Sequence, residues 1–228
     1  MLANILQQPT TWLTITLGAY LLGLKLHKIL NQASWLPPVL SGFLIVTSLL
    51  WITNTPYSTY EQGGQLLSFF LGPVVVGLAV PLFYHFHKMR KQFITILLAI
   101  TLGSLATVGT AVALTHYWIG IDSITTTMAS KSVTTPVAVA ISEQMGGIPA
   151  LAAAFVMVTG IIGAAIIPML LKAFHLDSPQ ATGMSLGICA HAVGTSRAIE
   201  LGQEYAAYSA MAMTLTASLH AVLLPWLF

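Results

Sequence analysis

Apolar stretches long enough to cross a lipid bilayer as helices dominate this amino-acid sequence. A spanning helix needs about 20 predominantly apolar residues. The candidate stretches cover about residues 11–30, 35–53, 65–84, 93–116, 119–142, 148–171, 181–195 and 206–228. Only 6% of the 228 residues are charged, which is too few to cover the surface of a soluble fold. We therefore predict an all-α, polytopic transmembrane helical bundle of about seven or eight membrane segments, forming one integral membrane domain over residues 1–228.

The residues that usually carry enzymatic or metal chemistry are scarce in this chain. Cys189 is the only cysteine, which excludes intrachain disulfides and a cysteine-based metal site. The acidic residues do not cluster, and no HExxH, phosphate loop or nucleophile elbow is present. The net charge of +2 is too small to indicate nucleic acid. We expect no enzymatic activity, no metal and no cofactor. The amino-terminal residues carry no positive charge before the first apolar stretch, unlike a cleavable signal peptide.

Two clusters of basic residues indicate how the chain is oriented in the membrane. The first is Lys25 with Lys28, and the second, two spans later, is Lys88, Arg90 and Lys91. Positive charge gathers in cytoplasmic loops, so both clusters are predicted inside and the N-terminus outside. The side of the C-terminus stays open, because the segment 119–142 can either cross the membrane or re-enter it.

The most polar part of the apolar segments is the stretch ASKSVTTPVAVAISEQMGG, residues 129–147. Proline suits the first turn of a helix, so we predict a helix break near residues 131–134 and a half-helix from Pro136 to about Gln144, capped by Thr134 or Thr135. Its N-terminus would carry free N–H groups beside the Lys131 ammonium, which is the composition of an anion site. The predicted substrate-binding residues here are Ser130, Lys131, Ser132, Thr134, Thr135 and Pro136.

Lys131 has two alternative roles besides anion binding. A lysine near the middle of a membrane is costly and should face protein or water. It could form a structural ion pair with Glu143 or Glu200, or its ammonium could extend to the membrane surface. We also consider Glu143, Glu200 and His191 as residues for proton coupling or charge pairing.

A second proline-containing stretch is LGPVVVGLAVPL, residues 71–82. Pro73 lies well inside an apolar segment, where it is expected to break the helix, so we predict a second discontinuous helix and include Pro73 in the site. LGPVVVGL and TTPVAVAI align on Pro73 and Pro136, which favours an internal repeat of the kind seen in transporters. Proline among valines is also a common composition in membrane segments.

The third stretch, SLGICAHAVGTSRAIELGQE, covers residues 185–204. Gly183, Gly187, Ala190, His191 and Gly194 are predicted to share one helix face that another backbone approaches closely. His191 could bind substrate or relay a proton, and Arg197 could hold a carboxylate in two hydrogen bonds. Alternatively, His191 packs as a hydrogen-bonded core residue, and Arg197 pairs with Glu200 one turn later. The predicted substrate-binding residues here are His191, Thr195, Ser196 and Arg197. We interpret the other histidines, His220 among them, as interfacial.

These three stretches, in this order and spacing, resemble the LrgB/CidB family of bacterial membrane proteins, whose plant relatives include the plastidial glycolate/glycerate transporter. The resemblance implies a multi-pass protein of the bacterial cytoplasmic (inner) membrane and a separate LrgA/CidA-type holin-like partner. It implies a link to murein hydrolase activity and lysis. It also implies transport of short monocarboxylates such as pyruvate, glycolate or glycerate.

Two functions follow as hypotheses. The first is a transporter of small organic anions, and the second is a non-transporting, antiholin-like regulator of the holin-like partner. The expected partners are a small carboxylate, the LrgA/CidA-type protein, the lipid bilayer and a second copy of the chain in a dimer.

Overall fold

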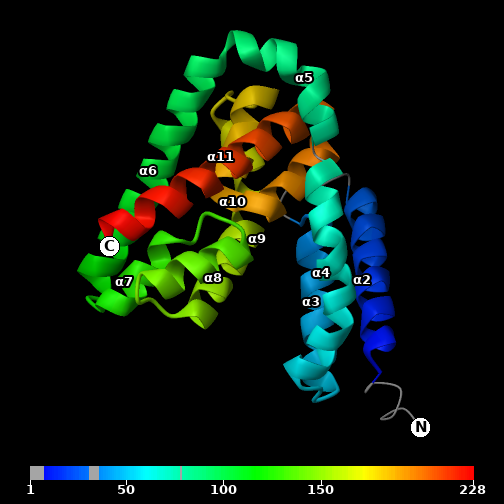
Figure 1. Ribbon diagram of the computed structural model, residues 1–228. Helices are drawn as coiled ribbons and strands as arrows, with labels where there is room; N and C mark the ends of the chain where they lie inside the picture. Colours follow the sequence, from blue (N-terminus) through cyan, green and yellow to red (C-terminus); the bar gives the residue numbers. More distant parts are fainter. Residues whose placement is uncertain (1–7, 31–35, 78) are drawn as a thin grey trace. The chain divides into compact units, whose positions relative to one another are not determined.

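The computed structural model describes residues 8–30, 36–77 and 79–228, and within these ranges every regular element is a helix. The chain divides into two compact units, Met1–Gly77 and Leu78–Phe228. Figure 1 shows the helices α2 to α11 in sequence colours. The predicted all-α fold is therefore confirmed.

The first unit contains three helices, α2 (Pro9–Ile29), α3 (Pro38–Ile52) and α4 (Tyr57–Gly77). Helix α2 packs against both α3 and α4. Two glycines allow close approach: a Cβ at Gly23 would lie 2.7 Å from the carbonyl oxygen of Pro38, and a Cβ at Gly63 of α4 would lie closer still to the carbonyl oxygen of Pro9. His27 is buried near the end of α2, and its Nδ1 lies 2.9 Å from the carbonyl oxygen of Leu36, which ties α2 to the start of α3.

The helix break predicted at Pro73 is wrong. Pro73 is exposed and lies inside α4, which continues to Gly77. A proline inside a helix removes one backbone hydrogen bond and crowds the preceding turn, but the surrounding turns can keep the helix intact. Pro136, in contrast, lies in the first turn of its helix. The two prolines aligned in the sequence therefore have different local structures, and the alignment of Pro73 with Pro136 does not extend to their backbones.

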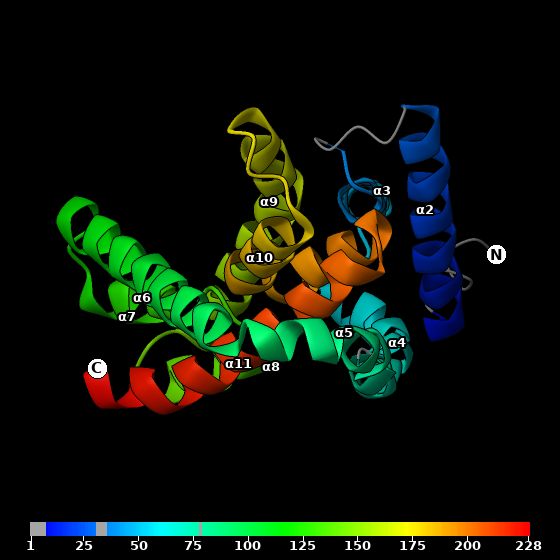
Figure 2. The ribbon, with the colours of Figure 1, turned by 90° about the horizontal axis from the view of Figure 1, so that it is seen from above.

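The second unit contains the remaining helices. They are α5 (Ala79–Lys91), α6 (Phe93–Trp118), α7 (Asp122–Ala129), α8 (Thr135–Gln144), α9 (Pro149–Ala173), α10 (Pro179–Leu201) and α11 (Gln203–Leu227). Helix α10 packs against both α9 and α11, α7 packs against α6 and α9, and α8 packs against α9 and α11. Figures 1 and 2 show α7 alongside α6.

Three of the described helices, α6, α9 and α11, are long and apolar enough to cross a membrane, and α3 is a shorter apolar helix. Large apolar side chains on these helices are exposed, for example Leu102, Ile162 and Val222. Exposing so many apolar side chains is unfavourable in water and favourable in lipid. The chain is a multi-pass membrane protein.

Helix α10 changes direction sharply at His191, whose backbone φ of 42° and ψ of −131° are not helical. A Cβ added to Gly194 would meet the side chain of Ala190 at 2.7 Å and the backbone of Leu186, although residues eight apart in a straight helix lie about 12 Å apart. The second half of α10 therefore folds back toward the first half.

The prediction that residues 183, 187, 190, 191 and 194 share one face of the helix is also wrong. Gly183 and Gly187 face α11, whereas Ala190 and His191 contact glycines of α9. The kink at His191 rotates the later residues, so helical spacing does not carry through to Gly194.

Candidate functional site

The chain leaves the helical conformation between α7 and α8, at residues 130–134. Thr134 precedes α8 in an extended conformation, and Pro136 lies in its first turn. Proline has a preset φ and no N–H to satisfy, which favours a helix start at this point. The side chain of Thr134 does not cap the helix, although the sequence predicted a cap from Thr134 or Thr135. The first-turn N–H groups of α8 therefore have no partner from this capping side chain.

The non-helical residues between α7 and α8 lie inside the second unit. Ala129, the last residue of α7, and Val133, within the connection, are buried in an apolar cluster with Val108 of α6, Val156 of α9 and Leu224 of α11. Helices thus surround the connection on several sides.

The two serines beside Lys131 are buried, with 0% of Ser130 and 1% of Ser132 exposed. The Ser130 hydroxyl donates to the carbonyl oxygen of Thr127 at 3.0 Å. The Ser132 hydroxyl is buried without a hydrogen-bond partner in the described chain. Thr134 and Thr135 are half-buried, and Pro136 is exposed. Ser132 is therefore the hydroxyl of this group most in need of a ligand or water.

Lys131 is half-buried, and no carboxylate of the described residues pairs with its ammonium. Glu143 is exposed, and Glu200 pairs with a different residue. The geometry therefore gives no support to a structural ion pair between Lys131 and either glutamate.

His191 and Thr195 both make contacts within the protein. Only 2% of His191 is exposed, and its Nε2 lies 3.0 Å from the carbonyl oxygen of Val156, to which it must donate because a carbonyl only accepts. Thr195 donates its hydroxyl to the His191 carbonyl oxygen at 2.9 Å and lies 2.9 Å from the Ser209 hydroxyl of α11. These contacts hold the kink of α10 against α9 and α11, as the packing alternative for His191 expected.

A further buried histidine, His220 of α11, was interpreted from the sequence as interfacial, and that interpretation is wrong. His220 lies within α11 with 2% exposed, and its Nε2 is 2.5 Å from the Ser104 hydroxyl of α6. Thr216, one turn earlier on the same helix, is also fully buried. The spacing of four residues between Thr216 and His220 in an apolar helix was the available sequence signal.

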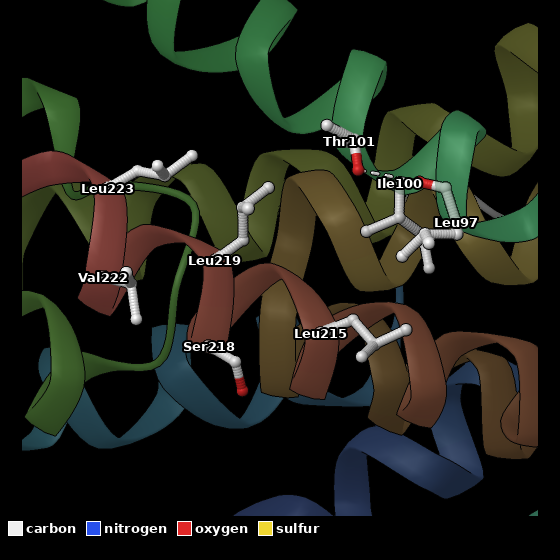
Figure 3. A pocket seen from close by; sticks show the side chains of 8 residues that line it. All are labelled: Leu97, Ile100, Thr101, Leu215, Ser218, Leu219, Val222 and Leu223. Atoms are coloured by element: carbon white, nitrogen blue, oxygen red, sulfur yellow. Dashed lines mark hydrogen bonds between the residues drawn. The ribbon is translucent and has the colours of Figure 1, made fainter.

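An open groove of about 340 Å³ lies between α6 and α11 (Figure 3). Most of its lining is aliphatic, including Ile100 and Leu219. Its two hydroxyls are already used, because Thr101 donates to the Leu97 carbonyl oxygen and Ser218 donates to the Thr214 carbonyl oxygen. The groove suits an apolar chain better than an anion, so the polar residues around Lys131 are the better candidate site.

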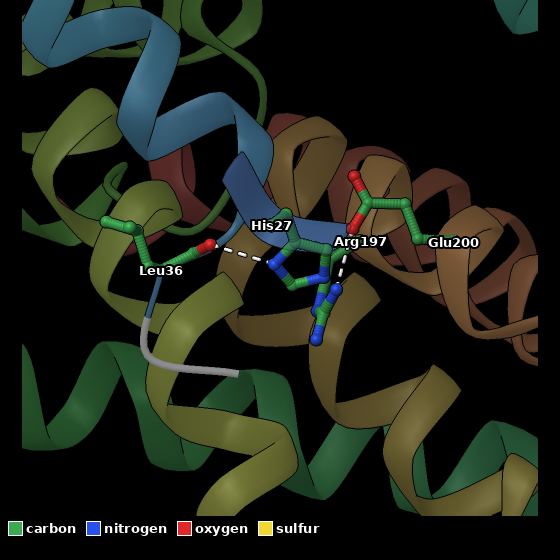
Figure 4. Close-up of polar contacts among 4 residues, drawn as sticks. All are labelled: His27, Leu36, Arg197 and Glu200. Atoms are coloured by element: carbon green, nitrogen blue, oxygen red, sulfur yellow. Dashed lines mark hydrogen bonds and ion pairs between the residues drawn. The ribbon is translucent and has the colours of Figure 1, made fainter. Parts of the chain in front are cut away.

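Arg197 and Glu200 form an ion pair across one turn of α10, with a distance of 2.7 Å from Nη1 to Oε2 (Figure 4). Arg197 is 4% exposed and Glu200 19% exposed. The ion pair that the sequence offered as the alternative to carboxylate binding by Arg197 is present in the structure. Ser196, also predicted as a substrate ligand, is half-buried between Thr195 and Arg197.

Comparison with known proteins agrees with the resemblance drawn from the sequence motifs. Residues 16–228 match the model of the LrgB-like family. The proteins YwbG and YxaC of Bacillus subtilis (strain 168) are each 34% identical, over 94% of this chain and over 95% and 94% of their own lengths. The "Antiholin-like protein LrgB" of Bacillus mycoides (strain KBAB4) is 32% identical over 95% of this chain and 94% of its own length. No solved structure matches the chain.

Proposed function

The chain belongs to the LrgB-like family, and on that premise we propose that it is a membrane transporter of small organic anions. One observation carries the proposal. Lys131 lies in the connection between two short helices and has no carboxylate partner among the described residues. The next residue, Ser132, has a buried hydroxyl without a hydrogen-bond partner in the described chain.

The chemistry at this point suits a carboxylate. An ammonium offers three donors, and Ser132 offers a fourth. The first turn of α8 adds free N–H groups and the positive end of a helix dipole. A half-buried positive charge without a counter-ion is costly, so a bound anion would stabilise this arrangement.

The backbone also resembles that of transporters with interrupted helices. In such proteins the substrate binds where membrane helices break, because irregular backbone is tolerated there only against protein or water. We propose that α7 and α8 together form one broken or re-entrant membrane segment. We propose the kink of α10 at His191 as the second interruption of the transport path.

The proposed substrates are short monocarboxylates such as pyruvate, glycolate or glycerate, which is the class that the family implies. We further propose the bacterial inner membrane as the location, with the N-terminus outside. Lys25, Lys28, Arg90 and Lys91 are exposed near the ends of α2 and α5, as basic residues on the cytoplasmic side should be.

Uptake of labelled pyruvate or glycolate into proteoliposomes tests the proposal, with Lys131→Ala compared with the wild type. Loss of a charge-assisted hydrogen bond of about 1.5–3 kcal/mol predicts a fall in apparent affinity of roughly tenfold or more. Lys172→Ala is the matched control, because Lys172 is exposed in the last turn of α9. Equal uptake by the wild type and Lys131→Ala removes Lys131 from the mechanism, and no uptake of any such acid refutes transport.

The name of the Bacillus mycoides relative favours a second candidate function, an antiholin-like regulator of murein hydrolase activity and lysis. This function requires a stable complex with an LrgA/CidA-type membrane protein and a lysis phenotype that persists in Lys131→Ala. Co-purification from membranes that express both proteins measures the complex. If the two proteins never associate, the regulatory function is excluded.

A further inference from the structure

The open groove between α6 and α11 (Figure 3) has one end close to the end of α5. Leu97 and Ile100 of α6 line the groove, about 6 and 10 Å along that helix from its first residue, Phe93. Ile100 is buried in one cluster with Met89 of α5, and Leu215, the first groove residue of α11, packs against the same cluster. The end of the groove at Leu97 and Leu215 is therefore the end nearest α5.

The groove has the length and the lining of a site for one lipid acyl chain. It follows α11 from Leu215 to Leu223, which is about 12 Å at 1.5 Å per residue. The hydrocarbon part of one leaflet is about 15 Å thick, and both α6 and α11 are long and apolar enough to cross a membrane. The lining residues carry no charge, and the two hydroxyls among them donate to carbonyl oxygens of their own helices.

Two exposed basic residues lie at the α5 end of this groove. Arg90 and Lys91 are exposed in the last turn of α5, and only Gln92 separates that helix from α6. Because α6 is an apolar candidate span, the residues directly before it are expected at the membrane surface. Helix α5 also packs against α11, so the two positive charges are close to both helices that form the groove.

The acidic residue of α11 does not neutralise this positive charge. Glu204, in the first turn of α11, is half-buried and accepts a hydrogen bond from Gln180 of α10 at 3.3 Å. Its carboxylate is thus engaged by α10. The surface end of the groove keeps the charge of Arg90 and Lys91 for a ligand.

An apolar groove that extends through most of one leaflet, with two cations at its surface end, matches an anionic phospholipid in shape and charge. We propose that the groove binds an acyl chain of such a lipid and that Arg90 and Lys91 bind its phosphate headgroup. Basic residues beside membrane helices recognise anionic headgroups in this way. The inference does not depend on transport, because it concerns other residues and another ligand.

A helix from a second copy of the chain fits the groove less well. A helix with its side chains is about 10 Å across, so a 12 Å length of it fills about 900 Å³. The groove has a volume of about 340 Å³. An apolar helix face also brings no negative charge to Arg90 and Lys91, whereas a phosphate does.

Native mass spectrometry of the full-length chain in detergent tests the proposal. The protein is titrated with phosphatidylglycerol or with phosphatidylcholine that has the same acyl chains. We expect the wild type to bind one phosphatidylglycerol about tenfold more tightly than phosphatidylcholine, and Arg90→Gln/Lys91→Gln to abolish this preference. The matched control is Lys25→Gln/Lys28→Gln, which removes two exposed basic residues near the end of α2 and should keep the preference.

A second variant tests the acyl-chain part of the site. Ser218 lines the groove and is exposed, so Ser218→Phe should fill the groove and weaken the binding of both lipids about tenfold, which corresponds to about two displaced methylene groups. Ala221→Phe is the matched control, because Ala221 is exposed on the same helix and does not line the groove. The thermal midpoint without added lipid shows whether each variant is folded, and if Ser218→Phe lowers it, the headgroup variant decides the inference alone.

Three results would overturn the proposal. The first is a wild type that binds both lipids equally. The second is a phosphatidylglycerol preference that persists in Arg90→Gln/Lys91→Gln or falls as much in Lys25→Gln/Lys28→Gln, since the charge would then act without a defined site. The third is a dimer that Ser218→Phe dissociates, which would assign the groove to a second copy of the chain.

Discussion

Replacing Gly160 by alanine tests the packing that holds the kink of α10. A Cβ at this position of α9 would lie 2.6 Å from Cε1 and 2.8 Å from Nε2 of His191, and 3.0 Å from a methyl group of Val193. Non-bonded carbon atoms prefer separations of about 3.5–4.0 Å, so the imidazole would have to move by about 1 Å. Such a movement breaks the 3.0 Å hydrogen bond from Nε2 to the Val156 carbonyl oxygen.

The loss of stability in Gly160→Ala follows from these contacts. Overpacking a dense core costs about 1–3 kcal/mol, and leaving the buried Nε2–H unpaired costs about 1–3 kcal/mol. Alanine recovers about 1 kcal/mol of helix propensity relative to glycine. We therefore expect Gly160→Ala to lower the free energy of unfolding by about 1–5 kcal/mol.

The measurement is reversible unfolding in mixed detergent micelles, with Gly109→Ala as the matched control. Nothing lies within 4 Å of a Cβ at Gly109, which is exposed on α6, so that variant should be neutral or slightly more stable. In a His191→Gly background, Gly160→Ala should lower the free energy of unfolding by less, because the imidazole ring that would clash with the new Cβ is absent. Equal stability of Gly160→Ala and Gly109→Ala would show that the His191 ring does not occupy the position described.

Two further predictions concern other residues of the second unit. His191→Gly should be more stable than His191→Ala by about 1–2 kcal/mol in the same unfolding assay, because a φ of 42° with ψ of −131° strains any residue with a Cβ. Equal stabilities of the two variants would contradict the kinked backbone. Glu200→Gln should destabilise the protein by about 1–3 kcal/mol because it removes the carboxylate that pairs with the guanidinium of Arg197. A Glu200→Gln variant as stable as the wild type would refute a stabilising role of this ion pair.

The local features of the site were predictable because their causes are local. A proline in a helix's first turn and a run of hydroxyl residues before it are enough to predict the interruption around Lys131, and the structure has non-helical backbone at residues 130–134. The Arg197–Glu200 pair likewise follows from a spacing of three on one helix. Pro73 shows the limit of the same rule, since α4 continues past it to Gly77.

Residues whose position depends on distant partners could not be predicted in this way. The kink of α10 falls at a histidine, a residue with no particular preference for this backbone conformation, and the contacts that hold it come from Val156 and Gly160 of α9. His220 gains its significance from Ser104, which lies 116 residues earlier in the chain.

Composition and helical periodicity by themselves determined that this protein is an all-helical membrane protein with a polar interruption at Lys131, because lipid burial and proline geometry act on neighbouring residues. Only the tertiary structure decided which side chains meet that interruption. Helix packing surrounded the connection with apolar residues of α6, α9 and α11 and left the hydroxyl of Ser132 buried without a partner within the described chain. Burial and pairing of polar groups depend on contacts between segments far apart in sequence, and no local pattern encodes them.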